Sequence, residues 1–148
     1  MKSKSEILFD GSEILKPLMI KNGFQFSVDG KGQSSGGNFA FGSWTKNDRK
    51  LEYHFRHSLG LVEYSLGAKS IAHEFFLWAL TGEKRKAKYP GSSEDPLDGF
   101  RRLFNDLIQF CVAFLSGSDT ELQKAIQEAE KLKEYWESLS PFKRMEIK

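Results

Sequence analysis

Residues 51–67, LEYHFRHSLGLVEYSLG, place two histidines and an arginine among aromatic and aliphatic residues. Side chains alternate along a β-strand, so Glu52, His54 and Arg56 should share one face and the aromatic residues between them the other. Neighbours on one face of a strand lie about 7 Å apart, which lets one anionic or planar ligand touch two of them. An arginine fork binds carboxylate or phosphate. A glutamate and a histidine can act as general acid and base.

The preceding predicted strand, 38–44, adds a wall to this face. Its apolar alternation, NFAFGSW, is interpreted as pointing Phe39 and Phe41 at the core, which turns Trp44 outward together with two small residues. The small residues would leave a shallow trough, and the indole could stack a flat ligand group. The alternative is an ordinary solvated sheet face on which Glu and Arg pair across strands. The candidate binding residues are Trp44, Glu52, His54 and Arg56.

Other reactive side chains do not assemble into a recognisable motif. His54 and His57 should face opposite sides of the sheet, and His73 is expected to make only a surface or interhelical contact, so we expect no metal site. The lone Cys111, in LIQFCVAFL, is predicted to be a buried hydrophobe. The loop GKGQSSGG fits neither the Walker nor the dinucleotide glycine pattern. The sequence therefore predicts no catalytic residue and no cofactor.

The elements that position the candidate site follow from hydrophobic periodicity. Short turn signals separate the strands, which favours a four-stranded antiparallel meander. Pro17 and Gly11 predict a break in the first helix. Asp95 and Ser118 are expected to be the N-caps of the last two helices. The predicted helices are 3–22, 69–82, 94–117 and 118–139, and the predicted strands are 24–28, 38–44, 51–55 and 61–66.

This order predicts a single α+β domain over residues 1–148, with the N-terminal helix and three C-terminal helices packed on one face of the sheet. A net charge of +2 is too small to argue for nucleic acid. The one basic cluster, EKRKAKYPG, follows a helix C-terminus, where cations are favoured by the helix dipole. No stretch has the length of a signal peptide or membrane span, and the lone cysteine fits a reducing, cytoplasmic setting.

The run GGNFAFGSWTKNDRKLEYHFRHSLGLVEYSLG, continued by SIAHEFFLWAL, resembles a family of small uncharacterised bacterial proteins. The likeness covers about residues 36–80. A leading helix ending in GF before a four-stranded meander also resembles immunity-protein-like domains. These resemblances imply a bacterial cytoplasmic protein and assign neither an activity nor a functional residue.

Three functions remain as hypotheses. The first is a non-enzymatic module, such as an immunity-type inhibitor, that binds a protein or a small acidic ligand on the sheet face. The second is a small hydrolase or isomerase with Glu52 and His54 as acid and base and Arg56 as the anion-binding group. The third is a nucleic-acid accessory protein that uses residues 84–88. The sequence predicts neither the oligomeric state nor the identity of a ligand.

Overall fold

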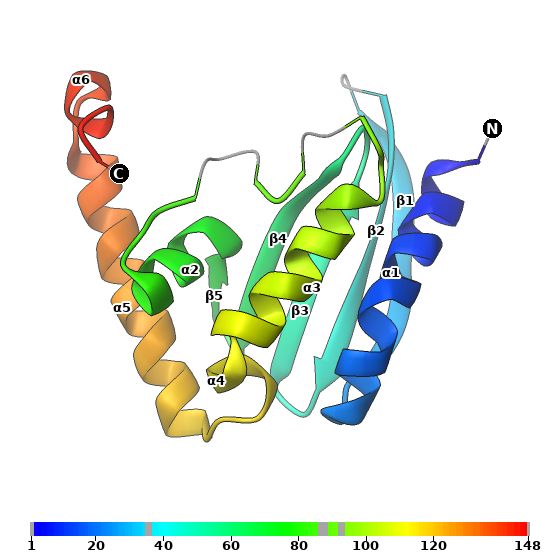
Figure 1. The fold of residues 1–148 in the computed structure, drawn as a ribbon, viewed down its shortest axis with the longest axis horizontal. Coiled ribbons are helices and arrows are strands. Elements are labelled where there is room, and N and C mark those ends of the chain that lie inside the picture. The colour runs from blue at the N-terminus through cyan, green and yellow to red at the C-terminus, as the bar shows by residue number, and fades with distance from the viewer. Residues whose placement is uncertain (1, 35–36, 86–88, 92–93, 148) are drawn as a thin grey trace.

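The computed structural model is an α+β fold in which one side of a five-stranded antiparallel sheet is covered by helices (Figure 1). It describes residues 2–34, 37–85, 89–91 and 94–147. The strands are β1 Gln25–Ser34, β2 Gly37–Lys46, β3 Arg49–Phe55, β4 Leu59–Leu66 and β5 Lys69–Ala72. The helices are α1 Lys4–Lys21, α2 His73–Thr81, α3 Asp98–Phe110, α4 Val112–Leu115, α5 Asp119–Ser138 and α6 Pro141–Arg144.

The strands lie in the sheet in chain order, β1-β2-β3-β4-β5, so the predicted meander is confirmed but has one more strand. The added strand, β5, falls where the sequence predicts the first turn of a helix. Leu66 of β4 pairs with Lys69 of β5 across a two-residue turn that contains Gly67 at a φ of 60°. That turn is a hairpin connection, and the four residues after it are too few to show a strand period.

One face of the sheet forms the core with the helices. Trp44 of β2, Leu51 of β3 and Tyr64 of β4 occupy matching positions across three strands, and all are buried. Phe100 of α3 packs edge-on against Tyr53, with ring centroids 5.6 Å apart. The predicted packing of helices on one side of the sheet is seen for α1, α2 and α3 in Figure 1.

The first helix runs unbroken from Lys4 to Lys21, so the predicted break at Gly11 and Pro17 is wrong. Pro17 lies on the exposed side, and one lost backbone hydrogen bond there does not end the helix. Gly11 instead marks a close approach between helices. A Cβ on Gly11 would lie 2.3 Å from the ring of Phe100, so the glycine lets α1 pack directly on α3.

The third predicted helix, 94–117, is two helices in the structure. It begins later than expected, at Asp98, because Asp95 caps the turn before it by accepting a hydrogen bond from the Leu97 amide at 2.9 Å. It is interrupted at Cys111, which separates α3 from α4. The predicted cap of the next helix is confirmed, since Ser118 Oγ accepts from the Glu121 amide at 3.1 Å.

A buried arginine ties the β2–β3 hairpin to the end of α4. The side chain of Arg49 is 7% exposed, and its guanidinium donates to the carbonyls of Ala113, Phe114 and Gly117 at 3.2, 2.8 and 2.5 Å. It also pairs with the carboxylate of Asp119 at 3.0 Å, the first residue of α5. These carbonyls have no partner within a helix, so Arg49 satisfies the C-terminal end of α4 from outside.

Candidate functional site

Glu52, His54 and Arg56 lie together on the face of the sheet that the helices leave open. In β3 the half-buried side chains of Glu52 and His54 alternate with the buried ones of Leu51, Tyr53 and Phe55. Arg56 follows the end of the strand and is half-buried as well. The predicted alternation of this strand is therefore confirmed.

Trp44 does not belong to this face, and its predicted outward orientation is wrong. The side chain is 1% exposed and pairs in register with Leu51 on the core side. Its indole N–H donates to the Tyr53 hydroxyl at 3.0 Å, and that hydroxyl lies 2.5 Å from Ser12 Oγ of α1. The indole is thus a hydrogen-bonded core residue beneath α1 and cannot be a wall of the open face.

Phe39 and Phe41 take the place predicted for Trp44, because the orientation of the whole strand is the reverse of the expected one. Phe41 pairs with His54, and the two rings stack at 5.0 Å with 15° between their planes. Phe39 also stacks on His54, with centroids 5.8 Å apart. The sequence shows the alternation of β2 correctly. The prediction is wrong because it assigns the set with two phenylalanines, and not the set with Trp44, to the core.

The reason for this orientation lies in the edge strand. Gly30 pairs with Phe41 and Gly32 with Phe39, and a Cβ on either glycine would lie within 3.0 Å of the paired ring. The two rings therefore occupy the space that side chains at these positions of β1 would fill. Aromatic rings that cover glycines on an edge strand stabilise the pairing of that strand. The face thus gains an apolar, aromatic surface next to His54.

A shallow depression of about 290 Å³ adjoins these aromatic rings. The guanidinium of Arg56 lies over the ring of Phe39, 5.7 Å from its centroid. Leu61, which also lines the depression, is 73% exposed and has a φ of 49°. We call Phe39, Phe41, His54, Arg56 and Leu61 the face patch. The lining of the depression is Phe39, His54, Arg56, Ser58, Gly60 and Leu61.

Glu52 shares the open face with the face patch but differs from it in being part of an ion pair. The carboxylate of Glu52 pairs with the ammonium of Lys50 at 3.0 Å and lies opposite Glu63 on β4. Partial burial lowers the pKa of His54, although Glu52 and Glu63 favour its charged form. A histidine held neutral in this way can accept or donate a hydrogen bond near neutral pH. Glu52, in contrast, is paired with a cation, the ammonium of Lys50.

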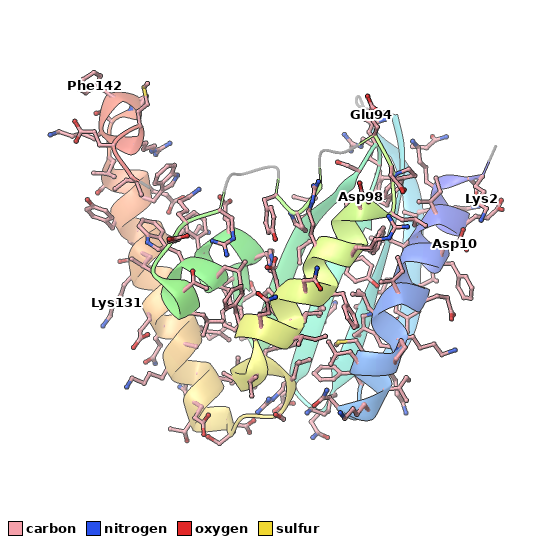
Figure 2. All side chains as sticks on the ribbon, in the orientation of Figure 1. Lys2, Asp10, Glu94, Asp98, Lys131 and Phe142 are labelled. Atoms are coloured by element: carbon pink, nitrogen blue, oxygen red, sulfur yellow. The ribbon has the colours of Figure 1, made fainter. Side chains whose placement is uncertain are left out.

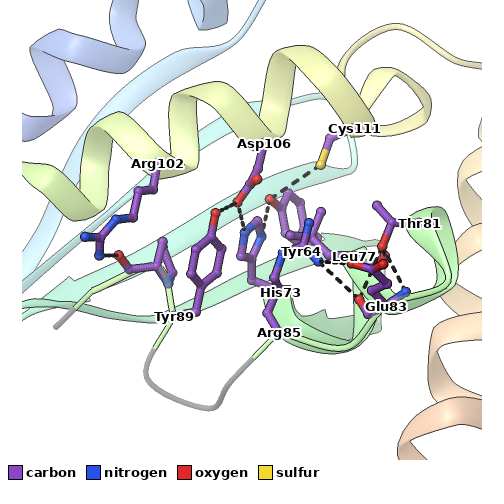
Figure 3. Close-up of polar contacts among 11 residues, drawn as sticks. Tyr64, His73, Leu77, Thr81, Glu83, Arg85, Tyr89, Arg102, Asp106 and Cys111 are labelled. Carbon is purple, nitrogen blue, oxygen red and sulfur yellow. Dashed lines mark hydrogen bonds and ion pairs between the residues drawn. The ribbon is translucent and has the colours of Figure 1, made fainter. Parts of the chain in front are cut away.

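A second polar cluster, which the sequence reasoning missed, lies inside the core (Figure 3). The Asp106 carboxylate of α3 accepts hydrogen bonds from His73 Nε2 at 3.0 Å and from the Tyr89 hydroxyl at 2.7 Å. Tyr64 of β4 bonds the other imidazole nitrogen of His73 at 2.7 Å. Of the two contacts expected for His73, surface or interhelical, the structure shows the interhelical one, which joins α2 to α3. We call Tyr64, His73, Tyr89 and Asp106 the buried network.

The proton positions in the buried network follow from its chemistry. An ionised carboxylate only accepts, so His73 carries its proton on Nε2 and its Nδ1 accepts from the Tyr64 hydroxyl. Cys111 approaches the same hydroxyl at 3.8 Å, and burial raises the pKa of its thiol to about 12, which keeps the thiol protonated. The one sequence signal for this network is an aspartate inside the apolar stripe of FRRLFNDLIQF.

Burial makes His73 a source of pH-dependent stability. Desolvation lowers its pKa from 6.5 even though the Asp106 carboxylate opposes the shift. The unfolded chain therefore takes up a proton near pH 6.5 that the folded protein does not bind. The free energy of unfolding is expected to fall as the pH drops from 7 to 5.5, with a slope of at most about 1.4 kcal/mol per pH unit for this one proton.

Urea unfolding at several pH values measures this slope, and His54→Gln removes the contribution of the other histidine with a lowered pKa. An NMR titration of the histidine side chains identifies the group directly. His73 should still be neutral at a pH where an exposed histidine is half charged. Titration of His73 at or above pH 6.5 would contradict the prediction.

The basic segment predicted at 84–88 lies partly outside the described residues, which here end at Arg85. Lys84 is not a surface cation, since its side chain is 7% exposed and its ammonium pairs with Glu74 at 2.7 Å. The ammonium also lies 4.1 Å from the ring centroid of Trp136. Arg85 lies over the rings of Tyr89 and Phe110, each 5.8 Å away. The two described cations of this segment thus contact α2, α5 and the Tyr89 loop.

Within the described ranges, no group of three or more His, Cys, Asp and Glu side chains could hold a metal ion. The described helices include none that is long and apolar enough to cross a bilayer. Comparisons of the chain with protein-family models, with curated proteins and with solved structures found no match.

Proposed function

We propose that the protein is a non-enzymatic binding module and that its contact surface for another protein is the face patch. The observation that carries this proposal is the exposure of the Leu61 side chain together with its strained backbone conformation. A large apolar side chain is 73% exposed there, on a residue whose backbone has a left-handed φ. That conformation costs about 1–2 kcal/mol for a residue other than glycine. Strain of this kind clusters at binding and catalytic positions.

The surroundings of Leu61 have the composition of a protein contact surface. Aromatic side chains and arginine are enriched in such interfaces, and the face patch combines Phe39, Phe41 and Arg56. Phe39, Phe41 and His54 lie in hydrogen-bonded strands, so little ordering of these three residues would accompany binding. The depression is shallow and open, which suits a side chain of a partner better than an enclosed substrate.

The acid–base alternative with Glu52 and His54 has weaker support. The two residues are two apart on one strand, about 7 Å along its axis, which is beyond hydrogen-bond reach. Glu52 is paired with Lys50, and His54 is stacked between phenylalanines. Neither arrangement directs the two groups to one reacting atom.

Leu61→Gly tests the proposal without unfolding the protein. Glycine adopts the left-handed backbone without strain, so the variant should be as stable as the wild type or more stable by about 0.5–1 kcal/mol. It should nevertheless lose its partner, because the exposed side chain is gone. The measurement is affinity capture from the cells in which the protein occurs, with thermal unfolding of each variant alongside.

Val112→Ala is the matched control, since Val112 is another exposed apolar residue, 57% exposed, but on α4 and away from the open face. A partner retained by the control and reduced at least tenfold by Leu61→Gly would support the proposal. Recovery of the same proteins by wild type and Leu61→Gly would refute it, and so would a wild type that recovers none.

A further inference from the structure

The described residues that line the depression beside Leu61 carry positive charge and no negative charge. Among the described residues that line it, Arg56 carries the only formal charge, and none is acidic. Ser58 and His54 add groups that can donate hydrogen bonds. The nearest carboxylate of β3, that of Glu52, is drawn toward Lys50 at 3.0 Å. The depression therefore combines a cation, hydrogen-bond donors and an apolar rim.

We propose that the face patch recognises a protein segment in which a carboxylate side chain stands next to an apolar one. Arg56 binds the carboxylate, and Leu61 with Phe39 contacts the apolar neighbour. This inference rests on the proposed function, because it names the chemistry of the partner that the same surface would take.

The anionic group that an unmodified protein segment offers to Arg56 is a carboxylate, which suits the guanidinium fork. The guanidinium carbon of Arg56 lies over the ring of Phe39, 5.7 Å from the centroid. An arginine has five N–H donors, so it can bind a planar carboxylate through two of them while it keeps other contacts. His54, stacked on Phe39 and Phe41, is held at the same rim of the depression. The charge of the site is thus complementary to an acidic residue.

The apolar half of the surface favours a protein segment over a small free anion. Small-ligand sites bury roughly 70–90% of their ligand, and a depression open on a flat sheet face encloses much less. Leu61 projects from this face and would stay exposed beside a small anion. A neighbouring apolar side chain on the same partner would cover it. Arg56 and the apolar side chain of Leu61 both find a partner only when the carboxylate and the apolar group belong to the same bound chain.

NMR titration of the full chain with defined probes tests this inference. The probes are the peptide acetyl-Glu-Leu-Glu-Leu-Glu-amide, the same peptide with lysine in place of glutamate, and sodium acetate. The acidic peptide should shift the amide resonances of Gly60 and Leu61 and bind about tenfold more tightly than the lysine peptide. Arg56→Gln should remove that preference. Arg101→Gln, at a half-exposed arginine of α3, should keep it.

Each outcome decides a separate part of the inference. Equal binding of both peptides would refute the role of charge. Acetate that shifts the same amides with the affinity of the acidic peptide would show recognition of a small anion and refute the protein segment. Absence of any shift from the acidic peptide, when Leu61→Gly still abolishes capture of a partner, would overturn this inference and leave the proposed function standing.

Discussion

Asp106→Leu is expected to lower the free energy of unfolding by about 3 kcal/mol, since each buried donor left without an acceptor costs about 1–3 kcal/mol. The carboxylate accepts from both His73 and Tyr89, and leucine accepts from neither. Asp106 is 5% exposed, so water cannot replace it. Urea unfolding measures the loss. Asn105→Leu, at the exposed neighbouring position of α3, is the control and should change stability by less than about 0.5 kcal/mol.

A double-mutant cycle separates the buried network from a simple change in packing. Tyr89→Phe alone removes one donor to Asp106 and should cost about 1 kcal/mol. In the Asp106→Leu background the same change should cost nothing or stabilise, because the orphaned hydroxyl is removed. Additive losses in the double variant would mean that Tyr89 and Asp106 do not act as a pair.

Arg49→Met is expected to cost a similar amount, about 3 kcal/mol, through the loss of hydrogen bonds to buried carbonyls. Methionine fills much of the arginine's volume but leaves the carbonyls of Ala113, Phe114 and Gly117 without their donor. Arg49→Lys should recover only part of the loss, because an ammonium is a point charge that cannot span the same fork. Thermal and urea unfolding of both variants measure the two losses.

The ion pair with Asp119 should contribute little to this effect. Its carboxylate side chain is 80% exposed, and exposed pairs contribute about 0–1 kcal/mol. Asp119→Ala should therefore leave most of the stability that Arg49→Met removes. A loss at Asp119→Ala as large as that at Arg49→Met would show that the ion pair, and not the carbonyl contacts, stabilises this corner.

The predictable part of the fold is the part that depends on local pattern. The α+β class, the antiparallel meander and the alternation of β3 follow from spacing and turn residues. The continuity of α1 does not, because Gly11 is explained by a contact with Phe100, 89 positions later in the chain. The sequence shows such a glycine but not the helix that packs on it.

The same limit applies to the candidate site. The period of β2 sorts its side chains into two sets, but which set meets the helices depends on Gly30 and Gly32 in a neighbouring strand. The orientation of Trp44 is predicted wrongly because the sequence of β2 alone does not show which of its two side-chain sets faces the helices. The predicted side is correct for Glu52 and His54, since the apolar set of β3 is unambiguous, and Arg56 continues their alternation just past the strand. Leu61 was missed because its exposure depends on an irregularity in strand pairing after Glu52.

The order of the elements along the chain has a consequence during synthesis. The whole meander is complete at Ala72, yet Phe100, Leu103 and Leu107, which cover its apolar side, belong to α3. Until α3 leaves the ribosome, Tyr53 and Phe55 lack the contact with Phe100 that covers them in the folded protein. A newly made chain at this stage exposes apolar surface through which it can aggregate with other chains. Slower expression, or expression with a holdase chaperone, should therefore raise the yield of native protein.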